Sequence, residues 1–261
     1  MQDFYEEILK IKAEGRSAAL ATIIGTKGST PRELGAKMLI REDGKIWGSV
    51  GGGCLEAELW QEAMKIIQEE KPRIVHFDLT GREAAESGMI CGGVMDIYVE
   101  PIIPTPRVFI FGGGHISLFV SRISAMVGFQ VVVIDDRPQF ANKERFPEAE
   151  ELVAEEFFLA FDKLKVNRSS YLVIVTRGHS YDQEVLEWAL GTEAKYIGMI
   201  GSRKKIQTVY ANLGEKGVPR DKLEKVHAPI GLDIGAVTPE EIAVSIVAEM
   251  IKALRKEKGG K

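Results

Sequence analysis

The sequence predicts an α/β protein of two domains, and three observations support this. After residue 106, near-continuous apolar strands alternate with helical segments, which is typical of a parallel sheet covered on both faces. Before residue 101, short strands and two helical segments show no such alternation and indicate a glycine-rich α+β domain. Between them, three prolines in residues 101–106 favour extended backbone and indicate a linker. We therefore place the domains at 1–103 and 104–261.

The first domain is expected to contain two helices and five strands. Phe4, Ile8 and Ile11 lie on one helical stripe, and apolar residues recur at helical spacing from Leu55 to Ile67. Asp43-Gly44 between two apolar runs is a strong hairpin signal. The patterns predict helices over 3–14 and 54–69 and strands over 18–25, 36–41, 45–50, 73–79 and 94–100.

The second domain should alternate between the two kinds of element. Its last helix has a clear start, because Thr238 can act as the N-cap, Pro239 suits the first helical position, and Glu241 completes a capping box. The apolar pattern predicts strands over 107–111, 130–135, 150–154, 171–176 and 195–200, and helices over 115–127, 182–190, 203–216 and from 239 onward.

A glycine motif indicates that this second domain is a Rossmann-like nucleotide-binding domain. Gly112-Gly-Gly114-His115-Ile-Ser117 follows a strand and opens a helix. Gly112 permits a tight turn, and Gly114 allows a pyrophosphate to approach the helix N-terminus beside His115. Asp135 ends the next strand, where an acid can accept hydrogen bonds from a ribose. Ser117 stands where the motif has Gly or Ala.

Three further groups follow strands of the same sheet. Arg137 can meet a 2′-phosphate or simply pair with Asp136 on the surface. His179 and Asp182 can form a proton-transfer pair, although a histidine in such a turn more often has a structural role. Ser202 and Arg203 open a helix, where the free N–H groups and dipole favour an anion; the alternative is a capped, solvated helix start.

Glycines also surround the two cysteines of the first domain. Gly52 and Gly53 precede Cys54, which falls in a first helical turn, where the helix dipole favours a thiolate. Cys91 precedes two more glycines. The alternative is that both cysteines are small buried side chains. Their separation of 37 residues offers no Cys-x-x-Cys pair, so we expect no structural zinc.

These segments resemble one family over most of residues 17–255. The first domain carries G-S-T-P-R at 28–32, G-A-K-M at 35–38, G-S-V-G-G-G-C-L-E at 48–56 and C-G-G at 91–93. The second carries F-G-G-G-H at 111–115, D-D-R-P-Q-F at 135–140, T-R-G-H at 176–179, Y-I-G-M-I-G-S-R-K-K at 196–205 and P-I-G-L-D-I-G at 229–235. They are similar to the xanthine dehydrogenase accessory factor family, the XdhC/CoxI type.

The resemblance implies a maturation role. Such a protein would bind molybdenum cofactor, support its sulfuration by a cysteine desulfurase, and insert it into a molybdenum hydroxylase apo-enzyme such as xanthine dehydrogenase. In that role Ser29, Arg32 and the glycine turns would hold the molybdopterin phosphate. Cys54 and Cys91 would approach the molybdenum or a transferred sulfur as soft ligands. The Rossmann-like crevice would take NAD(P) or the dinucleotide form of the pterin.

Composition limits the other possibilities. Lys and Arg number 34 and Asp and Glu 38, so the formal net charge of −4 disfavours binding to nucleic acid or to an anionic membrane. Two cysteines and an acidic amphipathic N-terminus without an apolar signal segment indicate a cytoplasmic protein. We also expect a homodimer. The alternatives to a maturation factor are an NAD(P)-dependent oxidoreductase and a scaffold that binds no small molecule.

Overall fold

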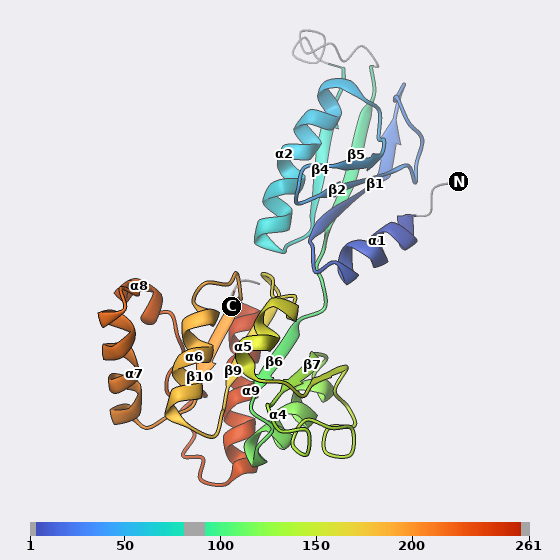
Figure 1. The fold of residues 1–261 in the computed structure, drawn as a ribbon. Coiled ribbons are helices and arrows are strands. Elements are labelled where there is room, and N and C mark those ends of the chain that lie inside the picture. Colours follow the sequence, from blue (N-terminus) through green and yellow to red (C-terminus); the bar gives the residue numbers. More distant parts are fainter. Residues whose placement is uncertain (1–3, 81–91, 257–261) are drawn as a thin grey trace. The chain divides into compact units, whose positions relative to one another are not determined.

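The computed structural model describes residues 4–80 and 92–256. It separates into two compact units, one ending at Pro104 and the other running from Thr105 to Lys256 (Figure 1). The chain is mixed α/β, with a five-stranded sheet in each unit. No helix of the described segments is both long and apolar enough to span a bilayer.

The first unit is an antiparallel sheet with one helix on each face. Its strands lie in the order β3-β2-β1-β5-β4. The strands are β1 (Ala18–Lys27), β2 (Lys37–Arg41), β3 (Ile46–Gly48), β4 (Arg73–Asp78) and β5 (Val94–Ile102), and the helices are α1 (Phe4–Ala13) and α2 (Gly53–Glu69).

Alternating side chains of β1 divide the core of this unit in two. Ala19 and Ile23 pack on the face that carries Leu59 of α2, whereas Leu20 packs on the opposite face with Ile11 of α1. This alternation is the ordinary period of a strand with both faces covered. The predicted strands and helices of the first unit are confirmed within a few residues at each end.

Pro101 is an exception, because we expected it in the linker and it lies in β5, opposite Ala19. The pairing of β4 with β5 ends at Arg73 and Val99. Beyond that point one side of β5 has no neighbouring strand. Proline is tolerated there, because its missing N–H group would have had no partner strand to bond with. The strand therefore continues two residues into the proline-rich stretch.

The second unit is a fully parallel sheet in the order β10-β9-β6-β7-β8, as the Rossmann-like interpretation predicted. Its strand order reverses direction between β6 and β9, which is where doubly wound sheets open a ligand crevice. The strands are β6 (Arg107–Phe111), β7 (Gln130–Ile134), β8 (Glu151–Val153), β9 (Ser170–Ile174) and β10 (Tyr196–Met199).

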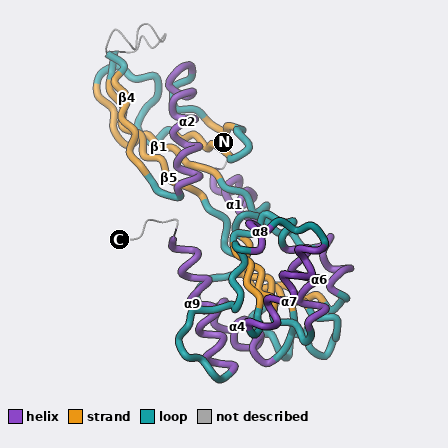
Figure 2. The backbone as a smooth tube through the Cα atoms, turned by 90° about the vertical axis from the view of Figure 1, so that its left-hand side faces the viewer, coloured by secondary structure: helices purple, strands orange, loops and turns teal. Residues whose placement is uncertain are grey.

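Helices cover both faces of this sheet. Figure 2 shows α4 and α9 on one side of the strands and α6 and α7 on the other. Two short helices and one 3-10 turn complete the unit. The helices are α4 (His115–Met126), α5 (Phe157–Ala160), α6 (His179–Ala189), α7 (Arg203–Glu215), α8 (Arg220–Leu223) and α9 (Pro239–Lys256), with the 3-10 turn at Phe161–Lys163.

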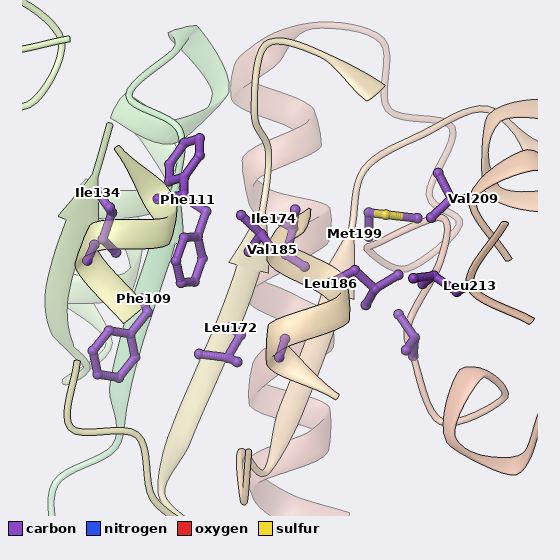
Figure 3. Packing of buried hydrophobic residues seen from close by; sticks show 14 of the residues in the cluster. Phe109, Phe111, Ile134, Leu172, Ile174, Val185, Leu186, Met199, Val209 and Leu213 are labelled. Carbon is purple, nitrogen blue, oxygen red and sulfur yellow. The ribbon is translucent and has the colours of Figure 1, made fainter. Parts of the chain in front are cut away.

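The strands of the second unit are apolar throughout because both faces are buried. In β6, Phe109 and Phe111 enter the cluster under α6 and α7, while Val108 and Ile110 enter the one under α4 and α9. Figure 3 shows the first cluster, with Leu186 packing among the strand side chains. This two-sided packing fixes the carboxyl ends of β6, β7 and β9 relative to one another.

Helix starts differ in how well the pattern predicted them. The capping box is confirmed, since the Glu241 amide donates to the Thr238 hydroxyl at 3.3 Å and the Thr238 amide donates to the Glu241 carboxylate at 3.1 Å. Helix α6 begins at His179, three residues before the expected start at 182. Helices α5 and α8 were not predicted, because four residues are too few to show a helical period.

A partly buried carboxylate ties α9 to the edge of the parallel sheet. Glu249 accepts from the Tyr196 hydroxyl at 2.6 Å and the Gly231 amide at 2.9 Å, and lies 3.1 Å from the His227 ring nitrogen. Burial raises the pKa of Glu249, but hydrogen bonds from His227, Tyr196 and Gly231 outweigh burial and lower it from 4.5 to about 2.

Glu249→Gln should therefore make the protein less stable at neutral pH. One pKa unit corresponds to about 1.4 kcal/mol, so the ionised carboxylate contributes about 3 kcal/mol. That stability is present above pH 4.5 and is lost as the pH falls toward 2, because the unfolded chain then binds the proton more readily. Urea denaturation at several pH values should show a flatter profile for the variant. Glu193→Gln, on an exposed side chain, is the control, and parallel profiles for wild type and Glu249→Gln would contradict the assignment.

Candidate functional site

The glycine loop after β6 lies at the point where the strand order reverses. The Gly112 amide donates to the Ile134 carbonyl at 2.7 Å. A Cβ on Gly112 would lie 2.5 Å from the Val175 carbonyl oxygen, and one on Gly113 would lie 2.5 Å from the Phe140 carbonyl oxygen. Gly112 also has a φ of +107°, which L side chains rarely adopt. The packing of the protein itself therefore requires glycine at both positions.

Gly114 is different, because nothing in the protein requires a glycine there. Its φ of −72° and ψ of −168° suit any residue, and a Cβ would meet no atom within 4 Å. It is the N-cap of α4 and supplies no side-chain cap. His115 follows it on the exposed first turn, while the buried Ser117 hydroxyl donates to the Gly112 carbonyl. Open space at the amino end of a helix is what a phosphate requires.

Asp135 lies beside this loop with its carboxylate fully engaged. Oδ2 accepts from the Gly113 amide at 2.7 Å and from Arg137 Nη2 at 2.8 Å. Oδ1 accepts from the Arg137 amide at 3.0 Å and from Arg137 Nε at 2.8 Å. Burial raises the pKa of Asp135, but hydrogen bonds from Arg137 and Gly113 prevail, so the pKa is lowered from its ordinary value. Asp135 thus fixes the loop and Arg137 together.

Arg137 pairs with Asp135 more closely than with Asp136, which lies 3.9 Å from its Nε. The Arg137 guanidinium also stacks 3.7 Å from the centroid of the Phe140 ring. Asp136 instead binds Arg177 at 2.7 Å. The pair with Asp136 that we weighed for Arg137 is thus present, but it is longer than the pair that Arg137 forms with Asp135.

Asp182 connects two of the strand ends. Its buried carboxylate accepts from the Thr176 hydroxyl at 2.7 Å and forms an ion pair with Lys205. Thr176 follows β9 and Lys205 lies in the first turn of α7, so this pair joins the two loops. The side chain of His179 lies outside what the structure describes, and the His179–Asp182 pair stays a prediction.

The start of α7 is capped in the ordinary way. Ser202 is the N-cap and its hydroxyl accepts from the Lys205 amide at 3.3 Å, while Arg203 is exposed. A groove of about 680 Å³ runs between α6 and α7 beside these residues. The groove is bridged by Asn212 to Gln183 at 2.9 Å and by Lys216 to Glu187 at 2.5 Å. Anion binding by Ser202 and Arg203 stays a prediction.

In the first unit, three glycine-rich segments distant in sequence converge where β1 ends, β5 begins and α2 starts (Figure 1). A Cβ on Gly28 would lie 3.2 Å from the Gly92 carbonyl oxygen, and Gly93 lies against the Ser29 carbonyl. A Cβ on Gly51 would lie 2.5 Å from Pro31. The segment 28–32 thus contacts both the glycines before Cys54 and those after position 91. Cys91 itself lies outside the described residues.

The glycine turn before α2 holds an anion that belongs to the protein. Oε1 of Glu56 accepts from the Ser49 hydroxyl at 2.6 Å and the Gly52 amide at 2.8 Å, and also from the amides of Val50 and Gly51 at 3.2 and 3.3 Å. Burial raises the pKa of Glu56, yet these donors lower it overall. The turn that we expected to cradle a cofactor phosphate is therefore occupied by a carboxylate.

The remaining predicted residues of this end are on the surface. Cys54 is an exposed, free thiol in the first turn of α2, and Ser29, Arg32 and Gly53 are exposed as well. Cys54 is thus not a buried hydrophobic side chain, the alternative that we had weighed. Within residues 4–80 and 92–256, no three His, Cys, Asp or Glu side chains gather as a metal site.

Three important residues were not singled out from the sequence. Glu56 could have been found, because an acid in the first helical turn after a glycine run suits the free N–H groups there. Lys205 is the last residue of the motif at 196–205, but its buried partner Asp182 was not foreseeable. Glu249 is an ordinary residue of an amphipathic helix until Tyr196 and His227 are brought beside it.

The glycine loop and the strand order define a Rossmann-type domain joined to a second, glycine-rich unit, and comparison with known families agrees. Residues 108–250 match the family model described as the XdhC Rossmann domain, and residues 11–78 match the XdhC and CoxI family. The chain belongs to this family. The resemblance drawn from its motifs is thereby confirmed.

Individual relatives are similar along nearly all of the chain. Protein YqeB of Escherichia coli is 34% identical over 99% of this chain, but the chain spans only 47% of that relative. A Bacillus subtilis protein, named as a probable subunit of xanthine dehydrogenase, is 23% identical, covering 98% of this chain and 99% of the relative. The molybdenum cofactor insertion chaperone PaoD of E. coli is 20% identical, covering 96% and 89%.

A solved structure also matches both units. The crystal structure of a xanthine dehydrogenase from Bacillus halodurans has 27% sequence identity and a TM-score of 0.53 with this chain, covering 96% of this chain and 95% of that one. The likeness supports the fold assignment.

Gly112 and Gly114 should respond differently to substitution. Gly112→Ala should lower the free energy of unfolding by about 1–3 kcal/mol, because it adds a clash at a strained φ. Gly114→Ala should leave it unchanged or raise it by up to about 1 kcal/mol. Gly114→Leu should also fold, yet obstruct the amino end of α4, so a nucleotide that binds the unchanged protein there should not bind this variant. Thermal melts measure the stabilities, and calorimetric titration measures nucleotide binding. Equal stability losses in Gly112→Ala and Gly114→Ala, or unchanged nucleotide binding by Gly114→Leu, would contradict this assignment.

Glu56 offers a second test, directed at the first unit. Glu56→Ala should lower stability by about 1–3 kcal/mol, because several amides lose their acceptor. Added formate, a small carboxylate that fits the vacated turn, should restore part of the loss in a thermal melt. Glu58→Ala, on an exposed residue of the same helix, should show neither effect. No rescue by formate would mean that Glu56 acts through packing rather than as an anion.

Proposed function

We propose that this protein is an accessory factor of a molybdenum hydroxylase, which binds molybdenum cofactor as cargo and delivers it to the apo-enzyme. Two relatives support this, because one is named as part of a xanthine dehydrogenase and the other as a molybdenum cofactor insertion chaperone. The single structural observation that carries it is the convergence of the segments at 28–32, 51–53 and 92–93 around an exposed thiol.

The chemistry of these residues fits the cargo in part. A cysteine sulfur is a soft ligand suited to molybdenum or to a sulfur in transfer, and Cys54 presents a free thiol at the surface. The turn at 50–52 is filled by Glu56, so the phosphate of the cargo needs other donors. Arg32 and Ser29, both exposed beside that turn, supply them in this proposal. Cys91 is assigned the same role as Cys54 from its place before Gly92.

The crevice of the second unit would hold a nucleotide part. Gly114 leaves the amino end of α4 open, and a backbone that approaches a ligand closely is the usual reason for such a glycine. The ligand is NAD(P) or the dinucleotide form of the pterin. Sulfuration by a cysteine desulfurase and a homodimeric state belong to the same proposal, as does a cytoplasmic location.

An NAD(P)-dependent oxidoreductase is the second candidate, favoured by the Rossmann strand order and by Gly114. The oxidoreductase candidate needs a group that transfers a proton. The Asp182 carboxylate suits this role poorly, because it is already bound by Thr176 and Lys205. Turnover separates the two candidates. An oxidoreductase oxidises or reduces nicotinamide catalytically, whereas a cargo carrier binds its ligand once per chain.

The decisive experiment is anaerobic purification followed by metal analysis and mass spectrometry of the bound small molecule. Molybdenum and a pterin in stoichiometric amount, transferable to an apo-hydroxylase that gains activity, are expected. Protein that carries neither after expression in a cofactor-producing host, and that fails to activate the apo-enzyme when cofactor is added, would contradict the proposal.

Cys54→Ser tests the thiol within this experiment. The side chain is exposed, so the change should alter stability by less than about 0.5 kcal/mol. A hydroxyl is a hard, neutral group and replaces the soft ligand poorly, so cofactor retention or sulfuration of the partner should fall. Cys91→Ser should behave alike if both thiols serve one cargo. Full retention and delivery by both variants would exclude a role for the thiols.

A further inference from the structure

Asp135, the acid that follows β7, has little capacity left for a ligand. An ionised carboxylate offers about four lone-pair positions, and four hydrogen bonds from Gly113 and Arg137 reach Asp135. Asp136 is bound by Arg177, and Asp182 by Thr176 and Lys205. The Asp135 carboxylate therefore has no lone pair left to accept hydrogen bonds from the two hydroxyls of a ribose.

The cation beside Asp135, Arg137, retains free donors. A guanidinium has five N–H groups, and Arg137 directs only Nε and one N–H of Nη2 at the Asp135 carboxylate. This is a side-on pairing, so the edge formed by Nη1 and the second N–H of Nη2 stays available. The Arg137 side chain is 27% exposed, and its plane is held against the Phe140 ring. The guanidinium is thus oriented in advance of any ligand.

We infer that this crevice recognises a phosphate monoester rather than a ribose diol, and that Arg137 is the residue that selects it. A planar guanidinium edge binds two phosphate oxygens through parallel N–H groups, which an ammonium cannot do. Asp135 is a positioning residue in this arrangement, since it orients Arg137 and holds the amide of Gly113. The inference rests on the proposed nucleotide site and names the ligand chemistry of that site.

Two ligands of the proposed function carry a phosphate monoester. One is NADP, whose 2′-phosphate distinguishes it from NAD. The other is molybdopterin, whose terminal phosphate is a monoester until a nucleotide is attached to it and would in this case bind Arg137 instead of Arg32 and Ser29. Each has a counterpart without the monoester. For NADP this is NAD, and for molybdopterin it is the dinucleotide, in which the same phosphate is part of a pyrophosphate. These two pairs therefore separate the two possible sources of the phosphate.

Calorimetric titration of the full chain with both pairs, under anaerobic conditions for the pterins, tests the inference. In at least one pair the monoester should bind about tenfold tighter or more. Arg137→Gln should reduce that preference to less than about threefold, chiefly by weakening the monoester ligand. No preference in either pair, including no binding at all, or a preference that survives in Arg137→Gln, would overturn the inference.

Two further variants keep the test informative. Arg137→Gln leaves the buried Asp135 carboxylate without its cation and can lower stability, so Arg137→Lys is measured beside it. Lysine retains the charge but not the fork, and its preference should be intermediate. Arg168→Gln, on a side chain that is 80% exposed, should change nothing. A chain that delivers cofactor without any monoester preference would overturn this inference alone, and the reverse result would overturn the proposed function alone.

Discussion

The geometry of the second unit depends on one buried negative charge. Asp135 is 1% exposed, and a carboxylate at such a place is tolerated only when hydrogen bonds and a cation compensate for lost water. Its partners are the glycine loop on one side and Arg137 on the other. Through these contacts, the end of β7 fixes the loop that follows β6. The orientation of Gly114 and the first turn of α4 follows from that constraint.

In the first unit, too, an acidic side chain accepts hydrogen bonds from the backbone of a glycine-rich segment. Its glycine turn before α2 gathers N–H groups that would otherwise lack acceptors, and Glu56 supplies the acceptor from within the helix. In each unit, then, an acid of the protein itself holds a glycine-rich segment in shape. The accessible feature of each segment lies beside this acid. It is the exposed thiol of Cys54 in the first unit and the open space at Gly114 in the second.

Much of this architecture was predictable from the sequence. Uninterrupted apolar strands such as 107–111 predicted the parallel sheet, because only burial on both faces tolerates them. Local signals also placed the cap at Thr238 and the loop at 112–114. Contacts between distant residues were not predictable. Residue types identified Asp135 and Asp182 as polar groups at strand ends. Only the folded structure shows that Arg137 pairs with the first carboxylate and Lys205 with the second.

Gly114 has a genetic consequence. A codon for glycine becomes one for alanine by a single base change, and the backbone at this position accepts alanine without strain. Larger side chains also fit the space that the protein leaves there. Mutations at this position would therefore yield chains that escape the quality control that removes misfolded protein. Such chains would keep a folded first unit while the amino end of α4 is obstructed, so the loss of a ligand at this position would not be accompanied by loss of the protein.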